Sequence, residues 1–183
     1  EESVRLRQEA IEVAQEAEVT ILFGGLPESY ESEAFDRPTM TLPPNHVKLI
    51  KAVAKTIPSS KLIVVVTNGS VVCMKEWIDD AGAVMESWLL GQAGGRAVCD
   101  LILGRANPSG RLAQTMSLAK EDVPTGAWFP GEHHQVQHRE GLNVGYRYYE
   151  TYQKDVAFPF GHGLSYTKFE YQNLVAKVVK DTE

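Results

Sequence analysis

Residues 61–67 read KLIVVVT, a short β-branched run that ends at the turn signal Asn68-Gly69. The run has no polar alternation, which indicates a strand buried on both faces, as in a parallel sheet. A second apolar run, VTILFGGL, covers residues 19–26 and contains a glycine pair. It predicts another core strand over residues 19–24.

Helical patterns alternate with these strands. Residues 2–17 and 45–56 each carry apolar side chains along one face, and a helix over residues 96–103 follows the segment GQAGG and ends at Gly104. Residues 83–90, AVMESWLL, are expected to form a further strand. The alternation with short loops predicts an α/β fold, a layered αβα sandwich with a mostly parallel sheet.

The sequence changes character after Arg105. A short strand is expected over residues 112–117, whereas residues 118–145 show no clear period and are rich in Gly, His and Pro. Residues 169–179 alternate loosely, which favours a strand. These features divide the chain into a sandwich portion, residues 1–166, and the start of a separate β domain, residues 167–183.

Composition excludes several classes of partner. The net charge of −6 offers no basic block for phosphate, so nucleic acid is not expected. No apolar run approaches the ~18–20 residues of a membrane span, and the first five residues, EESVR, do not resemble a signal peptide. No membrane partner is expected, and the compartment stays open. Cys73 and Cys99 lie in apolar contexts and are expected to be buried thiols.

The candidate chemistry follows the first strand. Residues 28–40 read ESYESEAFDRPTM and place four carboxylates within nine residues: Glu28, Glu31, Glu33 and Asp36. Ligands of open α/β sheets bind outside the carboxyl ends of the strands, so this acidic loop is a candidate for general acid/base work. A solvated surface loop would explain the same composition.

Other sites are less favoured. Right-handed crossovers would bring the acidic loop, Asn68-Gly69 and residues 91–95 (GQAGG) to one rim of the sheet. GQAGG lacks the Lys-Ser/Thr of a phosphate-binding loop, so it is better explained by close packing of the helix on the sheet. The histidines of residues 133–162 lack the spacing of a metal site. No cofactor or metal is expected.

Four segments together resemble the C-terminal α/β-sandwich domain of glycoside hydrolase family 3, which contains β-glucosidases and β-xylosidases. The resemblance spans roughly residues 11–171, and the segments are ESEAFDR (31–37) followed by Leu42-Pro43, GQAGG (91–95), NPSGRL (107–112), and VGYRYY (144–149) with FPFGHGLSY (158–166). It implies a retaining, exo-acting β-glycosidase. A (β/α)8 barrel would supply an Asp nucleophile, a loop of the sandwich would supply the acid/base, and a fibronectin-III-like domain often follows.

By position, Glu33 is the best match to the acid/base of this family, and Glu31 is the runner-up because the loop varies in length. Ala34 stands where the family commonly has Gly, so a positive φ there would strain the loop. Asp36 and Arg37 would brace the loop as an adjacent pair. The aromatic side chains of Tyr30 and Phe35, which lie among these acids, are expected to form an apolar wall for a sugar ring.

The chain has no room for a barrel of ~250 residues. It therefore resembles the later part of the sandwich, incomplete at its N-terminus, and we expect it to be inactive alone. Its partners would be the barrel of the same full-length protein and an oligosaccharide or aryl β-glycoside substrate. The alternatives are a non-catalytic α/β scaffold that binds carbohydrate or another domain, and a flavodoxin-like nucleotide binder.

Overall fold

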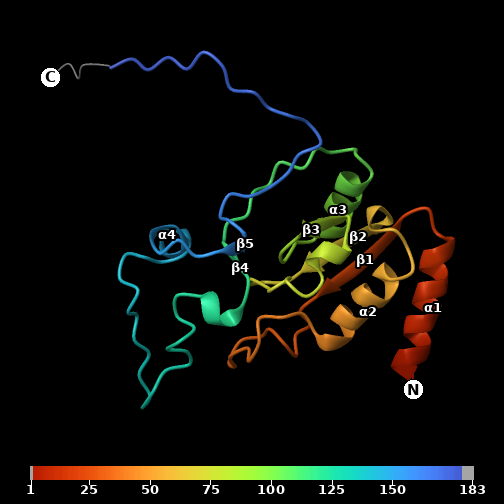
Figure 1. Ribbon diagram of the computed structural model, residues 1–183, viewed down its shortest axis with the longest axis horizontal. Helices are drawn as coiled ribbons and strands as arrows, with labels where there is room; N and C mark the ends of the chain where they lie inside the picture. The colour runs from red at the N-terminus through yellow and green to blue at the C-terminus, as the bar shows by residue number, and fades with distance from the viewer. Residues whose placement is uncertain (1, 179–183) are drawn as a thin grey trace.

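Three parallel strands form the centre of the computed structural model, which describes residues 2–178 (Figure 1). The strand order is β1-β2-β3, with β1 at Thr20–Gly25, β2 at Leu62–Thr67 and β3 at Ala83–Glu86. In the register of the ladder, Gly25 lies opposite Thr67. The carboxyl ends of β1 and β2 therefore coincide, which places the segments that follow them side by side.

Helices cover both faces of this sheet (Figure 1). On one face, α2 (Pro44–Ala54) packs its buried Val47, Ile50 and Val53 against the side chains of β2 that point toward it, and α1 (Glu2–Glu16) lies against α2. On the other face lies α3 (Gly94–Ile102). The layered α/β architecture predicted from the alternating pattern is confirmed, and these three helices, β1 and β2 begin and end within two residues of the expected bounds.

The central strand explains why the core forms here. Leu62, Val64 and Val66 are fully buried toward α2, and Val65 is buried toward α3. Burial on both faces is what an uninterrupted apolar run provides. The α3 face is less completely covered, because a groove of about 500 Å³ runs between α3 and β1 and leaves Phe23 of β1 67% exposed.

Two expectations for this part of the chain are wrong. The strand predicted over residues 83–90 ends at Glu86, because Trp88 adopts a φ of 54° that turns the chain out of the sheet. Cys73 is a buried free thiol as expected, but Cys99 is exposed, because it lines the groove beside α3.

The second half of the described chain contains little regular structure. Its elements are a two-stranded antiparallel sheet, helix α4 and one short 3-10 helix: β4 at Met116–Ser117, β5 at Val156–Phe158, α4 at Tyr146–Thr151 and η3 at Lys120–Asp122. Two further 3-10 helices lie in the first half of the chain, η1 at Ser59–Lys61 and η2 at Ile78–Asp80. Of the strand expected over residues 112–117, only the last two residues pair. Helix α4 and strand β5 were not predicted.

The strand expected over residues 169–179 is not formed in residues 169–178, and residue 179 lies outside the described part. This segment leaves the body of the molecule (Figure 1), and Tyr171 and Val178 are almost fully exposed. Loose alternation alone does not make a strand when no neighbouring edge is available for pairing. A separate domain over residues 167–183 stays a prediction.

No helix within residues 2–178 has the length and apolar character needed to cross a membrane.

The close approach of the ends of β1 and β2 can be tested by substitution of Gly25. A Cβ at Gly25 would collide with the carbonyl oxygen of Thr67, whereas a Cβ at the neighbouring Gly24 would meet nothing closer than 3.9 Å. We expect Gly25→Ala to lower the free energy of unfolding by about 1–3 kcal/mol. Gly24→Ala should change it by less than about 0.5 kcal/mol. Urea denaturation of both variants measures this, and equal losses would contradict the close approach.

Candidate functional site

The acidic loop, residues 26–43, connects β1 to α2 and lies over the turn that follows β2, residues 68–70. The ladder continues one residue past β1, because the N–H of Leu26 donates to the carbonyl of Thr67 at 3.0 Å. The N–H groups of Tyr30 and Glu31 then both donate to the carbonyl of Pro27, at 2.7 and 3.2 Å. This turn directs the Glu31 side chain back toward the end of β2.

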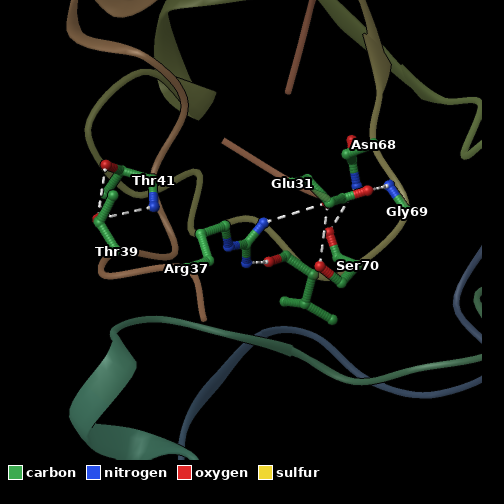
Figure 2. Close-up of polar contacts among 8 residues, drawn as sticks. Glu31, Arg37, Thr39, Thr41, Asn68, Gly69 and Ser70 are labelled. Atoms are coloured by element: carbon green, nitrogen blue, oxygen red, sulfur yellow. Dashed lines mark hydrogen bonds and ion pairs between the residues drawn. The ribbon is translucent and has the colours of Figure 1, made fainter. Parts of the chain in front are cut away.

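Glu31 joins the acidic loop to the turn (Figure 2). Its Oε1 accepts the backbone N–H of Gly69, and its Oε2 accepts the hydroxyl of Ser70 at 3.2 Å. The same Oε2 lies 3.5 Å from Nη1 of Arg37, and Nη2 of Arg37 donates to the carbonyl of Val71 at 2.6 Å. We call Glu31, Arg37 and these contacts with residues 69–71 the Glu31–Arg37 clamp.

The clamp corrects the expected Asp36–Arg37 brace. The guanidinium pairs with Glu31, whereas Asp36 is exposed and takes part in no ion pair of the described residues. The Arg37 side chain is only 13% exposed. Burial lowers the pKa of Arg37, and the charge of Glu31 opposes that effect. The clamp is therefore an ion pair shielded from solvent, which is screened less by salt than an exposed one.

Glycine is required where the clamp meets the turn. A Cβ at Gly69 would collide with Oε1 of Glu31. The turn itself is held by Asn68, which is fully buried and whose Nδ2 donates to the carbonyl of Ser70 at 2.8 Å. The Asn68-Gly69 dipeptide thus does more than end a strand, because each residue meets a separate requirement of the contact with Glu31.

Glu33 lies between the two members of the clamp and is exposed. Its main-chain carbonyl accepts the hydroxyl of Ser32 at 3.2 Å, but its carboxylate has no hydrogen-bond or ion-pair partner within residues 2–178. The next residue, Ala34, has a φ of 76°, so it carries the strain that the sequence predicts for an alanine with a positive φ at this position. The strained residue and the unpartnered carboxylate are therefore adjacent.

The two aromatic residues of the loop differ in environment. Tyr30 is half-buried, and Phe35 is 48% exposed. Both flank the segment that carries Glu33. An apolar wall for a sugar ring stays a prediction for these two residues.

Sequence reasoning missed Glu86, at the carboxyl end of β3. Burial raises the pKa of Glu86 to about 7, while the hydrogen bond from the N–H of Trp88 (3.1 Å) and the nearby amide of Asn68 oppose this rise, and the charge of Glu31 adds to it. Within the described residues, Oε2 of Glu86 and Oδ1 of Asn68 are both buried without a hydrogen-bond partner. A proton on Glu86 would let its hydroxyl donate to an acceptor such as Asn68 Oδ1. The signal in the sequence was a lone acid inside the apolar run AVMESWLL.

A cavity of about 580 Å³ separates the acidic loop from the second half of the chain. Arg37 and Val71 line one side, while Tyr146, Tyr149 and Phe160 line the other. Tyr146 stacks on Phe160 with ring centroids 4.9 Å apart. The segments VGYRYY and FPFGHGLSY therefore face the acidic loop across this cavity, although more than 100 residues separate them from it in the chain.

The remaining two motif segments have structural roles. In NPSGRL, the side-chain oxygen of Asn107 accepts a hydrogen bond from the N–H of Tyr166 at 2.9 Å, and the N–H of Leu112 donates to the carbonyl of His162 at 2.8 Å. Hydrogen bonds therefore join this segment to FPFGHGLSY. In GQAGG, a Cβ at Gly94 would lie 2.5 Å from the Cβ of Leu90. That crowding keeps the turn into α3 tight, but Leu90 lies beyond the end of β3, so close packing of the helix on the sheet stays a prediction. The acidic loop and residues 68–69 share one rim of the sheet as expected, whereas no described hydrogen bond joins residues 91–95 to the acidic loop.

The positive φ of Ala34 yields a stability prediction. An L side chain in the left-handed region costs about 1–2 kcal/mol, and the added freedom of glycine in the unfolded chain offsets part of that. Ala34→Gly should therefore raise the free energy of unfolding by about 0.5–1 kcal/mol. Ala127→Gly is the control, because Ala127 is exposed and is not among the residues with positive φ, and it should be neutral or destabilising. Equal effects of both substitutions in chemical denaturation would refute the strain.

The buried carboxyl of Glu86 yields a pH prediction. Its folded pKa of about 7 lies above the ordinary 4.5, so its contribution to stability is fully present below pH 4.5 and is lost as the pH rises through 7. Relative to Glu86→Gln, which does not titrate, the wild type should lose about 3 kcal/mol of unfolding free energy over this range. Unfolding curves at several pH values measure the difference, and parallel pH dependences would show that Glu86 does not titrate abnormally.

Comparisons with known proteins place these observations in a family. The glycosyl hydrolase family 3 C-terminal domain matches residues 3–166. Exo-alpha-(1->6)-L-arabinopyranosidase of Bifidobacterium longum is 46% identical over 97% of this chain and 23% of its own length. Thermostable beta-glucosidase B of Acetivibrio thermocellus is 48% identical over 92% of this chain and 22% of its own length.

Solved structures agree in fold. The GH3 beta-glucosidase of Bifidobacterium adolescentis superposes with a TM-score of 0.84 at 50% identity, over 88% of this chain and 24% of that one. The beta-glucosidase of Kluyveromyces marxianus in complex with glucose gives a TM-score of 0.84 at 36% identity, over 90% of this chain and 19% of that one. The chain thus spans between 19% and 24% of the length of these relatives. It belongs to glycosyl hydrolase family 3, as the C-terminal domain of that family of glycosidases.

Proposed function

We propose that this chain supplies the general acid/base of a retaining, exo-acting β-glycosidase, and that Glu33 is that residue. The observation that carries the proposal is the contrast between two carboxylates of one loop. Both oxygens of Glu31 are occupied by donors from the turn and from Arg37. The carboxylate of Glu33 is exposed and free of such partners within the described residues. An acid/base must exchange its proton with substrate and water, which requires an accessible oxygen.

The chemistry needs a second carboxylate from outside this chain. In the first step, Glu33 would protonate the glycosidic oxygen while an Asp of the barrel domain attacks the anomeric carbon and forms the glycosyl-enzyme. In the second step, Glu33 would take a proton from water as that water attacks the same carbon and releases the Asp. Retaining enzymes hold the two carboxyl groups about 5–5.5 Å apart. The reaction uses no metal or cofactor, and the chain alone, without the nucleophile, would be inactive.

The substrate is proposed from the relatives and from the loop. Beta-glucosidases recur among the related proteins, so we assign an oligosaccharide or aryl β-glycoside as substrate. Tyr30 and Phe35 flank Glu33 and would contact a sugar ring through their aromatic faces. The sugar itself is not decided by similarity, because an arabinopyranosidase and a beta-glucosidase are almost equally identical to this chain.

The test uses the full-length protein and the substitution Glu33→Ala. Loss of acid assistance should lower kcat/KM for a cellobiose-like disaccharide by about 10²–10⁴-fold. The first step on an aryl glucoside with an activated leaving group should survive, since that leaving group needs no proton. Azide should restore turnover in the second step and yield a glycosyl azide.

Glu28→Ala is the matched control, because Glu28 is an exposed acid of the same loop. It should leave all of these rates near those of the wild type. Wild-type rates in Glu33→Ala would overturn the assignment and favour a non-catalytic scaffold.

A further inference from the structure

The acidic loop has few points of attachment around Glu33. Within the described residues, no main-chain hydrogen bond joins residues 32–37 to another part of the chain. The loop regains such contacts only near its end, where the N–H of Cys73 donates to the carbonyl of Met40 at 2.7 Å. Thr39 and Thr41 hold that end through a hydrogen bond between their hydroxyls (Figure 2). The position of Glu33 therefore depends on side-chain contacts.

The Glu31–Arg37 clamp provides those contacts on both sides of Glu33. Glu31 precedes Glu33 by two residues and Arg37 follows it by four. Both side chains reach the same short segment, residues 69–71. The two ends of the segment that carries Glu33 are thus attached to one place on the sheet.

The turn that the clamp contacts is held in place by a buried residue, Asn68. Asn68 is fully buried, holds the turn through Ser70 and lies within hydrogen-bonding reach of Glu86 at the end of β3. The contact with Glu31 is therefore built on the ends of β2 and β3, next to the buried core of the sheet. An attachment of this kind can hold a catalytic group in place, whereas an exposed ion pair between two loops could not.

We propose that Glu31 is a positioning residue for Glu33, which acts by fixing the loop through Arg37 and residues 69–71. The inference rests on the proposed function of Glu33. Glu31 itself does not transfer a proton, because both of its oxygens already accept hydrogen bonds or pair with Arg37. Its effect is confined to steps in which Glu33 takes part.

The primary variant is Glu31→Gln in the full-length enzyme. The amide keeps an oxygen for the N–H of Gly69, but it replaces the anionic oxygen that faces Arg37 and Ser70. A misplacement of about 1 Å at a catalytic group can cost 10²-fold in rate, so we expect a loss of about 10–100-fold in kcat for a disaccharide. The first step on an activated aryl glucoside should change by less than about 3-fold. Glu28→Gln, in an exposed acid of the same loop, is the control and should match the wild type.

A double-mutant cycle separates positioning from independent roles. If Glu31 acts through Glu33, Glu31→Gln should have no further effect on the disaccharide rate in the Glu33→Ala background. Azide should rescue Glu33→Ala but not Glu31→Gln, which retains its acid/base. An additive loss, or an equal loss on both substrates, would overturn the inference while leaving the role of Glu33 intact.

The remaining outcomes are also decisive. A silent Glu33→Ala together with azide rescue of Glu31→Ala would exchange the two roles and overturn both proposals. If Glu31→Gln does not fold, Ser70→Ala removes only the hydroxyl that donates to Oε2 of Glu31 at 3.2 Å. That variant should show the same dependence on the leaving group, with a smaller loss of about 3–10-fold. Equal rates of Ser70→Ala and wild type on both substrates would then count against positioning.

Discussion

The hydrogen bond between the Glu31 carboxylate and the turn after β2 is the interaction on which the arrangement of the acidic loop depends. It requires a glycine at position 69, a buried amide at position 68 and a counterion at position 37. It also requires the ends of β1 and β2 to lie at the same height, which their register provides. The parallel sheet therefore determines more than the core, because it sets where the exposed loop can attach.

Much of the fold was predictable from the sequence because its signals are local. The β-branched run of β2 and the one-sided apolar pattern of α2 each show, from the residues of that element alone, which of its faces are buried. Expectations were wrong where the outcome depends on distant neighbours. The run after Glu86 is apolar enough for a strand, but a positive φ at Trp88 ends it, and residues 169–178 alternate without an edge to pair with.

The candidate site divides in the same way. The position of the acidic loop at a strand end followed from the pattern, and the resemblance identified Ala34 as a residue that stands where glycine is common. The positive φ of Ala34 is a finding of the structure. The partner of Arg37 did not, because adjacency in the chain favoured Asp36 whereas the fold brings Glu31 closer. Glu86 was missed for a related reason. Only the sheet places it beneath Asn68 and within the field of Glu31, and no spacing in the sequence encodes that proximity.

The exposed surface beside α3 has a consequence for how these residues behave in isolation. In the described sheet β1 is an outer strand, and its Phe23 is turned toward a groove that α3 does not fill. An open strand edge with aromatic side chains next to it is a template for pairing with a second chain. At high concentration, this chain in isolation is expected to self-associate through this edge. A lack of hydrolysis in such a sample would then have two causes, aggregation and the missing nucleophile.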